Sequence, residues 1–241
     1  MTGAAISWRQ VAPLFHAAAR SEQAGSWSTD APGQEKSTSH VMEARDLIFR
    51  YRQQGEPVLR GVSLRISQGD WLLLEGESGG GKSTLAALLT GLREPNSGML
   101  LLRGLDKQTL GSQTWRKRVA AAPQYHENHI LAASLAFNLL MGRYWPPSAG
   151  DLNEADVICR ELGLGPLLQR MPAGLMQMVG ETGWQLSHGE RSRVFMARAL
   201  LQGGDLIVLD ESFAALDPEN LRQALECVVK RARTLLVVAH P

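Results

Sequence analysis

The stretch Gly76-Glu77-Ser78-Gly79-Gly80-Gly81-Lys82-Ser83-Thr84 decides the fold of this chain. It has the spacing G-x-x-x-x-G-K-[ST], and it lies between the apolar run Trp71 to Leu74 and the apolar segment Leu85 to Leu89. A buried strand, a glycine-rich turn and a helix in this order form a phosphate-binding loop. We therefore expect an α/β fold built around a nucleotide site.

The parts of this loop suit the phosphates of a nucleotide. The glycines from Gly79 to Gly81 let backbone N–H groups turn inward around a phosphate, and a helix that begins near Lys82 adds the positive end of its dipole. The Lys82 ammonium would meet the β- and γ-phosphates, and the Ser83 hydroxyl would bind Mg²⁺. A glycine turn that happens to precede a helix is the alternative, but all four fixed positions of the motif are present. The residues from Gly76 to Thr84 are therefore candidates for binding ATP or GTP.

The composition limits the class of protein. With 241 residues, of which 44% are hydrophobic and 20% charged, the chain suffices for one main domain with a short extension. The formal net charge of +1 and the lack of a long basic run argue against nucleic acid as a partner. Cys159 and Cys227 lie in segments with a helical pattern, so neither a disulfide framework nor a metal site built on them is expected.

The sequence shows no segment that would enter a membrane. No apolar stretch approaches the roughly 18 residues needed to cross a bilayer, and the first residues lack the pattern of a signal peptide. We therefore expect the chain itself to be soluble and cytosolic, with any membrane association made through a partner.

The first forty residues differ in character from the rest. Residues 4–20 carry apolar side chains at helical spacing, namely Trp8, Val11, Phe15 and Ala18. This pattern predicts a short amphipathic helix, for which packing on the domain is the plainer interpretation. Residues 21–40 have the composition of a linker. We predict an extension over residues 1–40 and a domain over residues 41–241.

The domain itself combines strand and helix patterns. Short apolar runs between turn residues predict strands at Leu47 to Phe49, Val62 to Ile66, Trp71 to Leu74 and Met99 to Leu102. Residues 134–178 change to helical periodicity, which predicts a helical subdomain inserted into the core. The core resumes with a strand, a helix and a strand at Leu206 to Leu209, Pro218 to Ala232 and Leu235 to Ala239. The predicted fold class is an α/β phosphate-loop NTPase core with a mixed sheet, an antiparallel β lobe and an inserted α-helical subdomain.

A second nucleotide motif ends the predicted strand Leu206 to Leu209, where Asp210 and Glu211 follow four apolar residues. In phosphate-loop enzymes the acidic residue at such a strand end holds Mg²⁺, which suits Asp210. Glu211 would project toward the γ-phosphate and polarise the attacking water as a general base. An ordinary acidic turn after a strand is the alternative, and the presence of the phosphate loop argues against it.

The segment Leu186-Ser187-His188-Gly189-Glu190 resembles the Leu-Ser-Gly-Gly-Gln signature of ATP-binding cassette (ABC) ATPases. The resemblance covers residues 41–241, and the motifs come in the order found in that family. Ser187 and Glu190 also form the pattern of a capping box, which predicts a helix start. A capping box without any ligand is the alternative interpretation.

The resemblance implies the ABC ATPase fold and a second cassette as partner. Ser187 and Gly189 would then grip the ATP held by the phosphate loop of that second cassette, in a head-to-tail homodimer or heterodimer. His188 departs from the glycine of the signature and Glu190 from its glutamine, so an extra imidazole would lie near the triphosphate.

Other positions match the family one by one. Tyr51 matches the aromatic residue that stacks on adenine, and Gln124 matches the glutamine that senses Mg²⁺ and the attacking water. Asp217 matches the aspartate loop at the dimer interface, and His240 the histidine that hydrogen-bonds the γ-phosphate. Their plainer alternatives are packing, a surface residue, a helix start and a loop residue, respectively. The resemblance thus implies a catalytic set of Lys82, Gln124, Glu211 and His240, and a Mg²⁺ site made by Ser83, Gln124 and Asp210.

The subtype follows from Val179-Gly180-Glu181-Thr182-Gly183, which resembles a segment of exporter cassettes that contacts the membrane domain. Residues 1–40 look like the tail and linker that follow a fused membrane domain, and the family normally continues beyond residue 241, so the domain is expected to be truncated there. We therefore predict the ATP-hydrolysing cassette of an exporter, working with a transmembrane transport domain at the cytoplasmic face of the plasma membrane. The alternatives are an importer's ATPase subunit and a soluble, non-transport cassette or regulatory module.

Overall fold

The computed structural model of the chain describes residues 40–123 and 129–239. The predicted helix at residues 4–20, the linker up to residue 39, Gln124 and His240 lie outside the described residues.

The strands fall into an antiparallel sheet and a parallel sheet. The antiparallel sheet has the order β2-β1-β4, with β2 at Leu59–Ser67, β1 at His40–Phe49 and β4 at Ser97–Leu102. The parallel sheet has the order β3-β9-β8-β5, from β3 (Trp71–Leu74) through β9 (Leu235–Val238) and β8 (Leu206–Asp210) to β5 (Val119–Ala122). The sequence predicted an antiparallel lobe and a strand-helix-strand return, and both are confirmed. β3, which precedes the phosphate loop, belongs to the parallel sheet.

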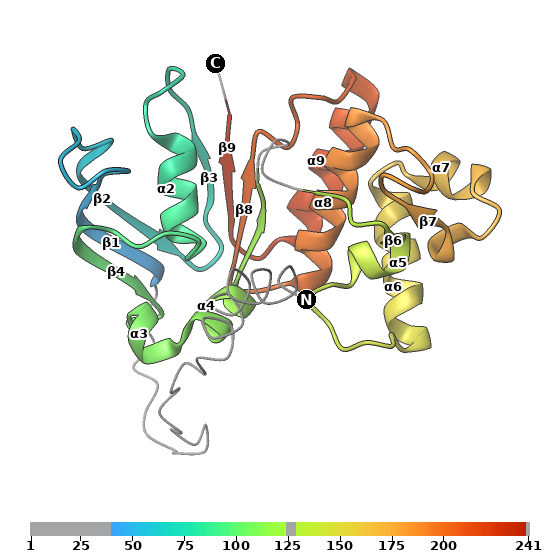
Figure 1. Ribbon diagram of the computed structural model, residues 1–241, viewed down its shortest axis with the longest axis horizontal. Coiled ribbons are helices and arrows are strands. Elements are labelled where there is room, and N and C mark those ends of the chain that lie inside the picture. Colours follow the sequence, from blue (N-terminus) through green and yellow to red (C-terminus); the bar gives the residue numbers. More distant parts are fainter. Residues whose placement is uncertain (1–39, 124–128, 240–241) are drawn as a thin grey trace, which may run out of the picture.

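Helix α2 (Lys82–Leu89) lies between the two sheets, as Figure 1 shows. Its Leu88 and Leu89 belong to one buried cluster with Met42 and Leu47 of β1 and Val208 of β8. Burying apolar side chains against both sheets is the main source of stability available to so short a helix. This packing fixes the N-terminus of α2 next to the carboxyl ends of the parallel strands.

The expectation of a buried strand before the phosphate loop is wrong for β3. Trp71 is 56% exposed and Leu73 is 59% exposed. β3 is an end strand of its sheet, paired with β9 alone among the described strands, so its apolar side chains are only partly covered. The run in β8 was expected to be covered on both faces, and every residue from Leu206 to Asp210 is indeed buried.

Most of the remaining helices form a second core beside the parallel sheet (Figure 1, right). They are α5 (Leu135–Leu139), α6 (Ala149–Glu161), α7 (Gly165–Arg170), η2 (Gly174–Met176), α8 (His188–Gln202) and α9 (Pro218–Arg231). The predicted helical subdomain also contains a two-stranded antiparallel pair, β6 (Ala133–Ser134) and β7 (Met178–Val179). Two short helices, α3 (Lys107–Leu110) and α4 (Ser112–Arg118), connect β4 to β5. Cys159 and Cys227 lie on helices as expected, and burial raises the pKa of each thiol to about 12.

One glycine determines how β1 and β4 fit together. At Gly98 φ is +94°, and an added Cβ would lie 2.4 Å from the carbonyl oxygen of Asp46. Asp46 itself has φ of +51°, within an irregularity of the β1 register. A side chain at position 98 therefore collides with backbone that cannot easily withdraw.

We expect Gly98→Ala to lower the free energy of unfolding by about 2 kcal/mol more than Gly69→Ala. Gly69 is the matched control because its φ is +90° but nothing lies within 4 Å of an added Cβ. Urea unfolding of the two variants and the parent measures the difference. Equal losses would show that the backbone at Asp46 yields and that only the left-handed conformation matters.

Candidate nucleotide site

The phosphate loop curls around its own lysine. The Lys82 ammonium donates hydrogen bonds to the carbonyl oxygens of Gly76 (2.6 Å) and Glu77 (2.9 Å). Gly79 and Gly81 have φ of +81° and +84°, a region that glycine enters without strain. An added Cβ at Gly81 would also lie 2.9 Å from Leu59 Cδ2. The glycines are therefore needed both for the turn and for its close approach to β2.

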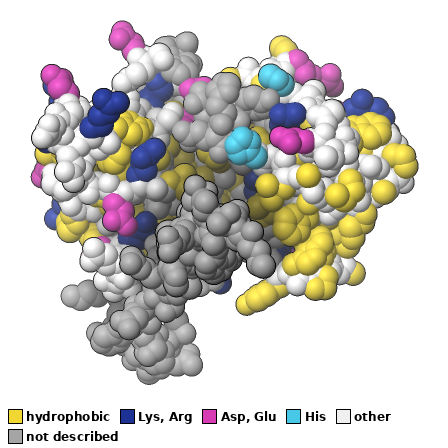
Figure 2. All heavy atoms as spheres, viewed as in Figure 1, with side chains coloured by type: hydrophobic (Ala, Val, Ile, Leu, Met, Phe, Trp, Pro, Cys, Tyr) yellow, Lys and Arg dark blue, Asp and Glu magenta, His cyan; other side chains and the backbone are white. Residues whose placement is uncertain are grey.

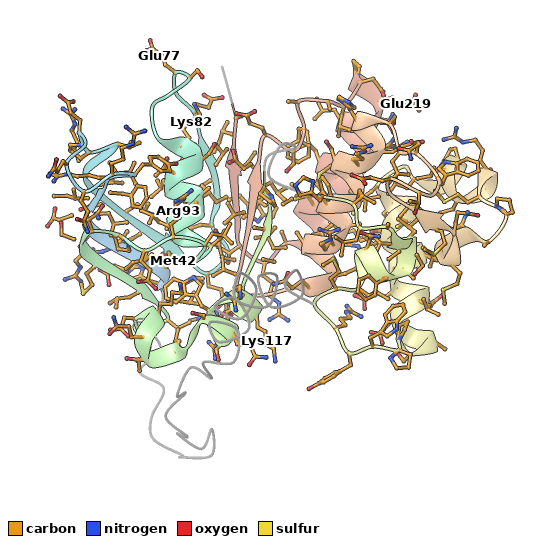
Figure 3. All side chains as sticks on the ribbon, in the orientation of Figure 1. Met42, Glu77, Lys82, Arg93, Lys117 and Glu219 are labelled. Carbon is orange, nitrogen blue, oxygen red and sulfur yellow. The ribbon has the colours of Figure 1, made fainter. Side chains whose placement is uncertain are left out.

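Glu77 contributes its backbone to this loop. Its carbonyl oxygen also accepts the Gly80 N–H at 3.2 Å. Its side chain is exposed and points outward from the tip of the loop, whereas Lys82 lies at the start of α2 (Figure 3). Any contact of Glu77 with a phosphate would thus be made through main-chain atoms.

A cavity of about 340 Å³ lies over the loop and brings together residues from distant parts of the sequence. Its lining consists of Tyr51, Val58, Ser78, Gly79, Gly81, Lys82, Ser83, Thr84 and Glu211. An aromatic ring, the backbone of a helix N-terminus, an ammonium and a carboxylate thus face one space. This combination fits a nucleotide with its base, its phosphates and a reacting water.

Tyr51 contributes the aromatic ring to the lining of this cavity. Its hydroxyl lies 2.9 Å from Thr84 Oγ1, and its ring packs edge-on against Phe49 with 5.1 Å between centroids. The Arg93 guanidinium lies over the Tyr51 ring, 4.8 Å from its centroid, at a cation–π distance. Tyr51 is still 57% exposed, so part of the ring remains available for stacking.

The end of β8 carries the two carboxylates. Asp210 is buried and lines a small pocket together with Ser83. A hydroxyl and a carboxylate are hard oxygen donors, so these two residues suit Mg²⁺. Glu211 has φ of +50°, and its N–H donates to the carbonyl oxygen of Val238 at 2.9 Å. A left-handed glutamate at a strand end is a strained conformation of the kind that occurs at functional sites.

The signature segment begins α8 as the capping box predicted. The Ser187 hydroxyl accepts the Glu190 N–H at 3.2 Å, and the Glu190 carboxylate accepts the Ser187 N–H at 2.8 Å. Arg170 of α7 also donates to Glu190 at 2.5 Å. Ser187 and His188 are exposed, so the start of α8 is accessible from solvent.

The signature residues do not join the phosphate-loop cavity of their own chain. None of Ser187, Gly189 and Asp217 is among the described residues that line this cavity. The three instead lie near one another, since a Cβ added at Gly189 would be 3.1 Å from the carbonyl oxygen of Ala215 in the turn before Asp217. The structure thus divides the predicted residues into two groups, one around Lys82 and one at the start of α8.

Several residues around these groups were missed from the sequence. Arg93 reaches Tyr51, Arg170 reaches Glu190, and Arg193 and Asn220 join α8 to α9. Each of these contacts pairs residues from separate elements, and neither residue type nor spacing indicates such a pairing. Val58 also lines the cavity, although nothing in its sequence context points to a nucleotide.

The strand, glycine loop and helix, together with the acidic end of β8, define a phosphate-loop nucleotide-binding domain. Residues 59–214 match the protein family described as ABC transporter, and the chain belongs to this family. It is therefore an ABC ATPase cassette.

Curated relatives and a solved structure agree with this membership. The chain is 37% identical over 199 residues to the glutathione/L-cysteine transport system ATP-binding/permease protein CydC of Escherichia coli, covering 81% of this chain and 33% of that protein. It is 35% identical over 195 residues to the ATP-dependent lipid A-core flippase of Chromohalobacter salexigens, covering 80% and 32%. The solved structure of a bacterial Atm1-family ABC exporter with ATP bound matches with a TM-score of 0.75 and 28% identity, covering 85% of this chain and 35% of that one. The chain spans about a third of the length of each of these three proteins.

We expect Tyr51→Ala to raise the Kd for ATP about tenfold, the size of a lost aromatic–base stacking contact. Tyr51→Phe keeps the ring and loses only the hydroxyl that meets Thr84, so its Kd should stay within about twofold of the parent. Isothermal titration of each purified variant with ATP provides the comparison. Equal weakening by both substitutions would assign the effect to the hydroxyl and not to the ring.

Proposed function

We propose that this cassette binds MgATP and hydrolyses it to power export through a transmembrane partner. The cavity that unites Tyr51, the phosphate loop and Glu211, in a member of the ABC transporter family, is the observation that carries the proposal. Its walls supply the groups for phosphoryl transfer to water, which depends mainly on positioning and on charge neutralisation.

Each group has a distinct task in this proposal. The Glu211 carboxylate would accept a proton from the attacking water. The Lys82 ammonium would neutralise charge on the β- and γ-phosphates, helped by the N-terminus of α2. Ser83 and Asp210 would hold Mg²⁺, which supplies further neutralisation at the phosphate oxygens when bound. By their place in the motif order, Gln124 and His240 would act on the attacking water and the γ-phosphate.

The separate position of the signature supports a two-cassette enzyme. Ser187 and His188 are exposed, and neither Ser187 nor Gly189 is among the described residues that line the cavity of this chain. Their contact with ATP would thus require a second cassette, arranged head to tail, whose phosphate loop faces α8. One isolated cassette would then bind ATP without a complete catalytic site.

Exposed apolar side chains support a transmembrane partner. Figure 2 shows hydrophobic side chains gathered over the helical subdomain, and the exposed ones in that region include Leu131, Met141, Tyr144, Trp145, Met176 and Met178. A large exposed apolar patch commonly marks an interaction surface. The exporter-like segment, Val179 to Gly183, lies in this surface, where a Cβ added at Gly180 would be 2.8 Å from the carbonyl oxygen of Leu131.

Across the described ranges, no helix combines the length and the apolar character needed to cross a bilayer. We infer that the cassette docks on its transport domain here, at the cytoplasmic face of the membrane.

We expect Glu211→Gln to lower the steady-state ATPase rate by at least about a hundredfold, because the amide cannot accept the proton of the attacking water. ATP should still bind, and light scattering should show a dimer in MgATP, since hydrolysis no longer resets the closed state. Glu226→Gln, an exposed carboxylate on α9, is the matched control and should hydrolyse like the parent. A Glu211→Gln protein with parental activity would remove Glu211 from the mechanism.

A further inference from the structure

Arg193, on the first turns of α8, is a buried cation with an unusual set of partners. It is only 8% exposed, and burial lowers the pKa of its guanidinium. Its Nε donates to the carbonyl oxygen of Gly189 at 3.2 Å, and its Nη1 donates to the carbonyl oxygen of Gly163 at 2.8 Å. Nη1 also donates to Asn220 Oδ1 on α9. One guanidinium thus ties the signature turn to the loop between α6 and α7 and to α9.

Asn220 extends this connection to Asp217. Its Nδ2 donates to Asp217 Oδ2 at 2.6 Å, and its backbone N–H donates to Asp217 Oδ1 at 3.1 Å. These hydrogen bonds, led by the one from the Asn220 side chain, hold the pKa of Asp217 below its usual range. A continuous path of hydrogen bonds therefore runs from Gly189 through Arg193 and Asn220 to Asp217.

Close packing leaves this path little freedom. At Gly163, where φ is +72°, an added Cβ would lie 2.6 Å from Gln223 Oε1, 2.9 Å from Asn220 Oδ1 and 3.0 Å from Arg193 Nη1. At Gly189 an added Cβ would meet the carbonyl oxygen of Ala215 at 3.1 Å. Two glycines thus allow the backbone to come close enough for the guanidinium to reach all its acceptors.

The Asp217 turn is also joined to the catalytic end of β8. The Ala214 N–H donates to the carbonyl oxygen of Glu211 at 3.2 Å, and the Leu216 N–H donates to that of Phe213 at 3.1 Å. Two successive turns therefore separate Glu211 from Asp217.

A buried arginine could serve only to pack α8 against α9. For that task apolar side chains would suffice, since burying a charge carries a desolvation penalty that its partners must offset. Here the acceptors of the guanidinium include the carbonyl oxygen of the signature glycine, Gly189, and the side chain of Asn220, which holds Asp217. Gly189 and Asp217 both belong to the surface assigned above to a second cassette. The fork of an arginine can hold several acceptors at fixed angles, which a lysine cannot do.

We propose that Arg193 is a positioning residue that holds the signature turn at Ser187 to Gly189 directly, and the Asp217 turn through Asn220, in one arrangement, so that a second cassette meets both turns together. This inference rests on the two-cassette function proposed above. It predicts that losing the connection weakens ATP-driven pairing of cassettes and leaves ATP binding at the phosphate loop of each chain unchanged.

The test uses the full chain in the Glu211→Gln background, in which ATP is not consumed. We expect Arg193→Gln and Asn220→Ala each to raise the ATP concentration for half-maximal dimerisation about tenfold, the size of a lost charge-assisted hydrogen bond, with the double variant no worse than Arg193→Gln alone. Asn220→Asp keeps an acceptor for Arg193 but opposes Asp217 with a second carboxylate, so it should weaken dimerisation as Asn220→Ala does. Arg222→Gln, which removes an exposed cation from the same helix α9, should match the parent.

Two further measurements separate positioning from general damage to the fold. The Kd for ATP at protein concentrations too low for dimers should match the parent in every variant, and hydrogen exchange of residues 214–220 should rise in Arg193→Gln, although the substitution lies on another helix. If Asn220→Ala and Asn220→Asp, folded with parental unfolding temperatures, dimerise at the parental ATP concentration, the inference is overturned. If the Glu211→Gln parent itself binds ATP and stays monomeric, the two-cassette function fails, and the inference fails with it.

Discussion

The packing of α2 between the two sheets is the constraint on which the rest of this cassette depends. The antiparallel sheet and the parallel sheet each cover one side of a helix of only 8 residues, and its N-terminus is thereby held beside the ends of β3 and β8. The peptide dipoles and the N–H groups at that end form an anion site only while their direction is fixed. The two hydrophobic cores thus differ in what they position. The core around α2 orients the phosphate loop, and the core of the helical part holds α8, which carries the signature segment.

Much of this arrangement could be predicted from the sequence because its signals are local. The phosphate loop depends on glycines at left-handed positions, the start of α8 on a capping box, and the buried strand β8 on a continuous apolar run, and each pattern lies within a few residues. The exposure of β3 could not be predicted in the same way. The run Trp71 to Leu74 is as apolar as that of β8, and only the order of strands places it at an end of the sheet.

The same distinction holds for the site. Tyr51 and Glu211 could be proposed from motif order, and the structure places both on the cavity over the phosphate loop. The arginines could not be predicted, because Arg93, Arg170 and Arg193 take their roles from partners on other elements. Glu190 is a residue whose accommodation only the structure explains. Its replacement of the usual amide is compatible with α8 because its carboxylate accepts the Ser187 N–H and is paired with Arg170.

The left-handed backbone of Glu211 has an evolutionary consequence. A residue with a Cβ in this conformation costs about 1 kcal/mol relative to glycine, and the cassette carries that cost at the position to which the proposed mechanism assigns the general base. The residue that would best stabilise the fold at position 211 is therefore not the residue that the proposed ATP hydrolysis requires there. In a lineage that no longer needs hydrolysis, Glu211→Gly would increase the stability of the folded cassette. The reverse substitution would then lower that stability, so the lost general base would be hard to regain.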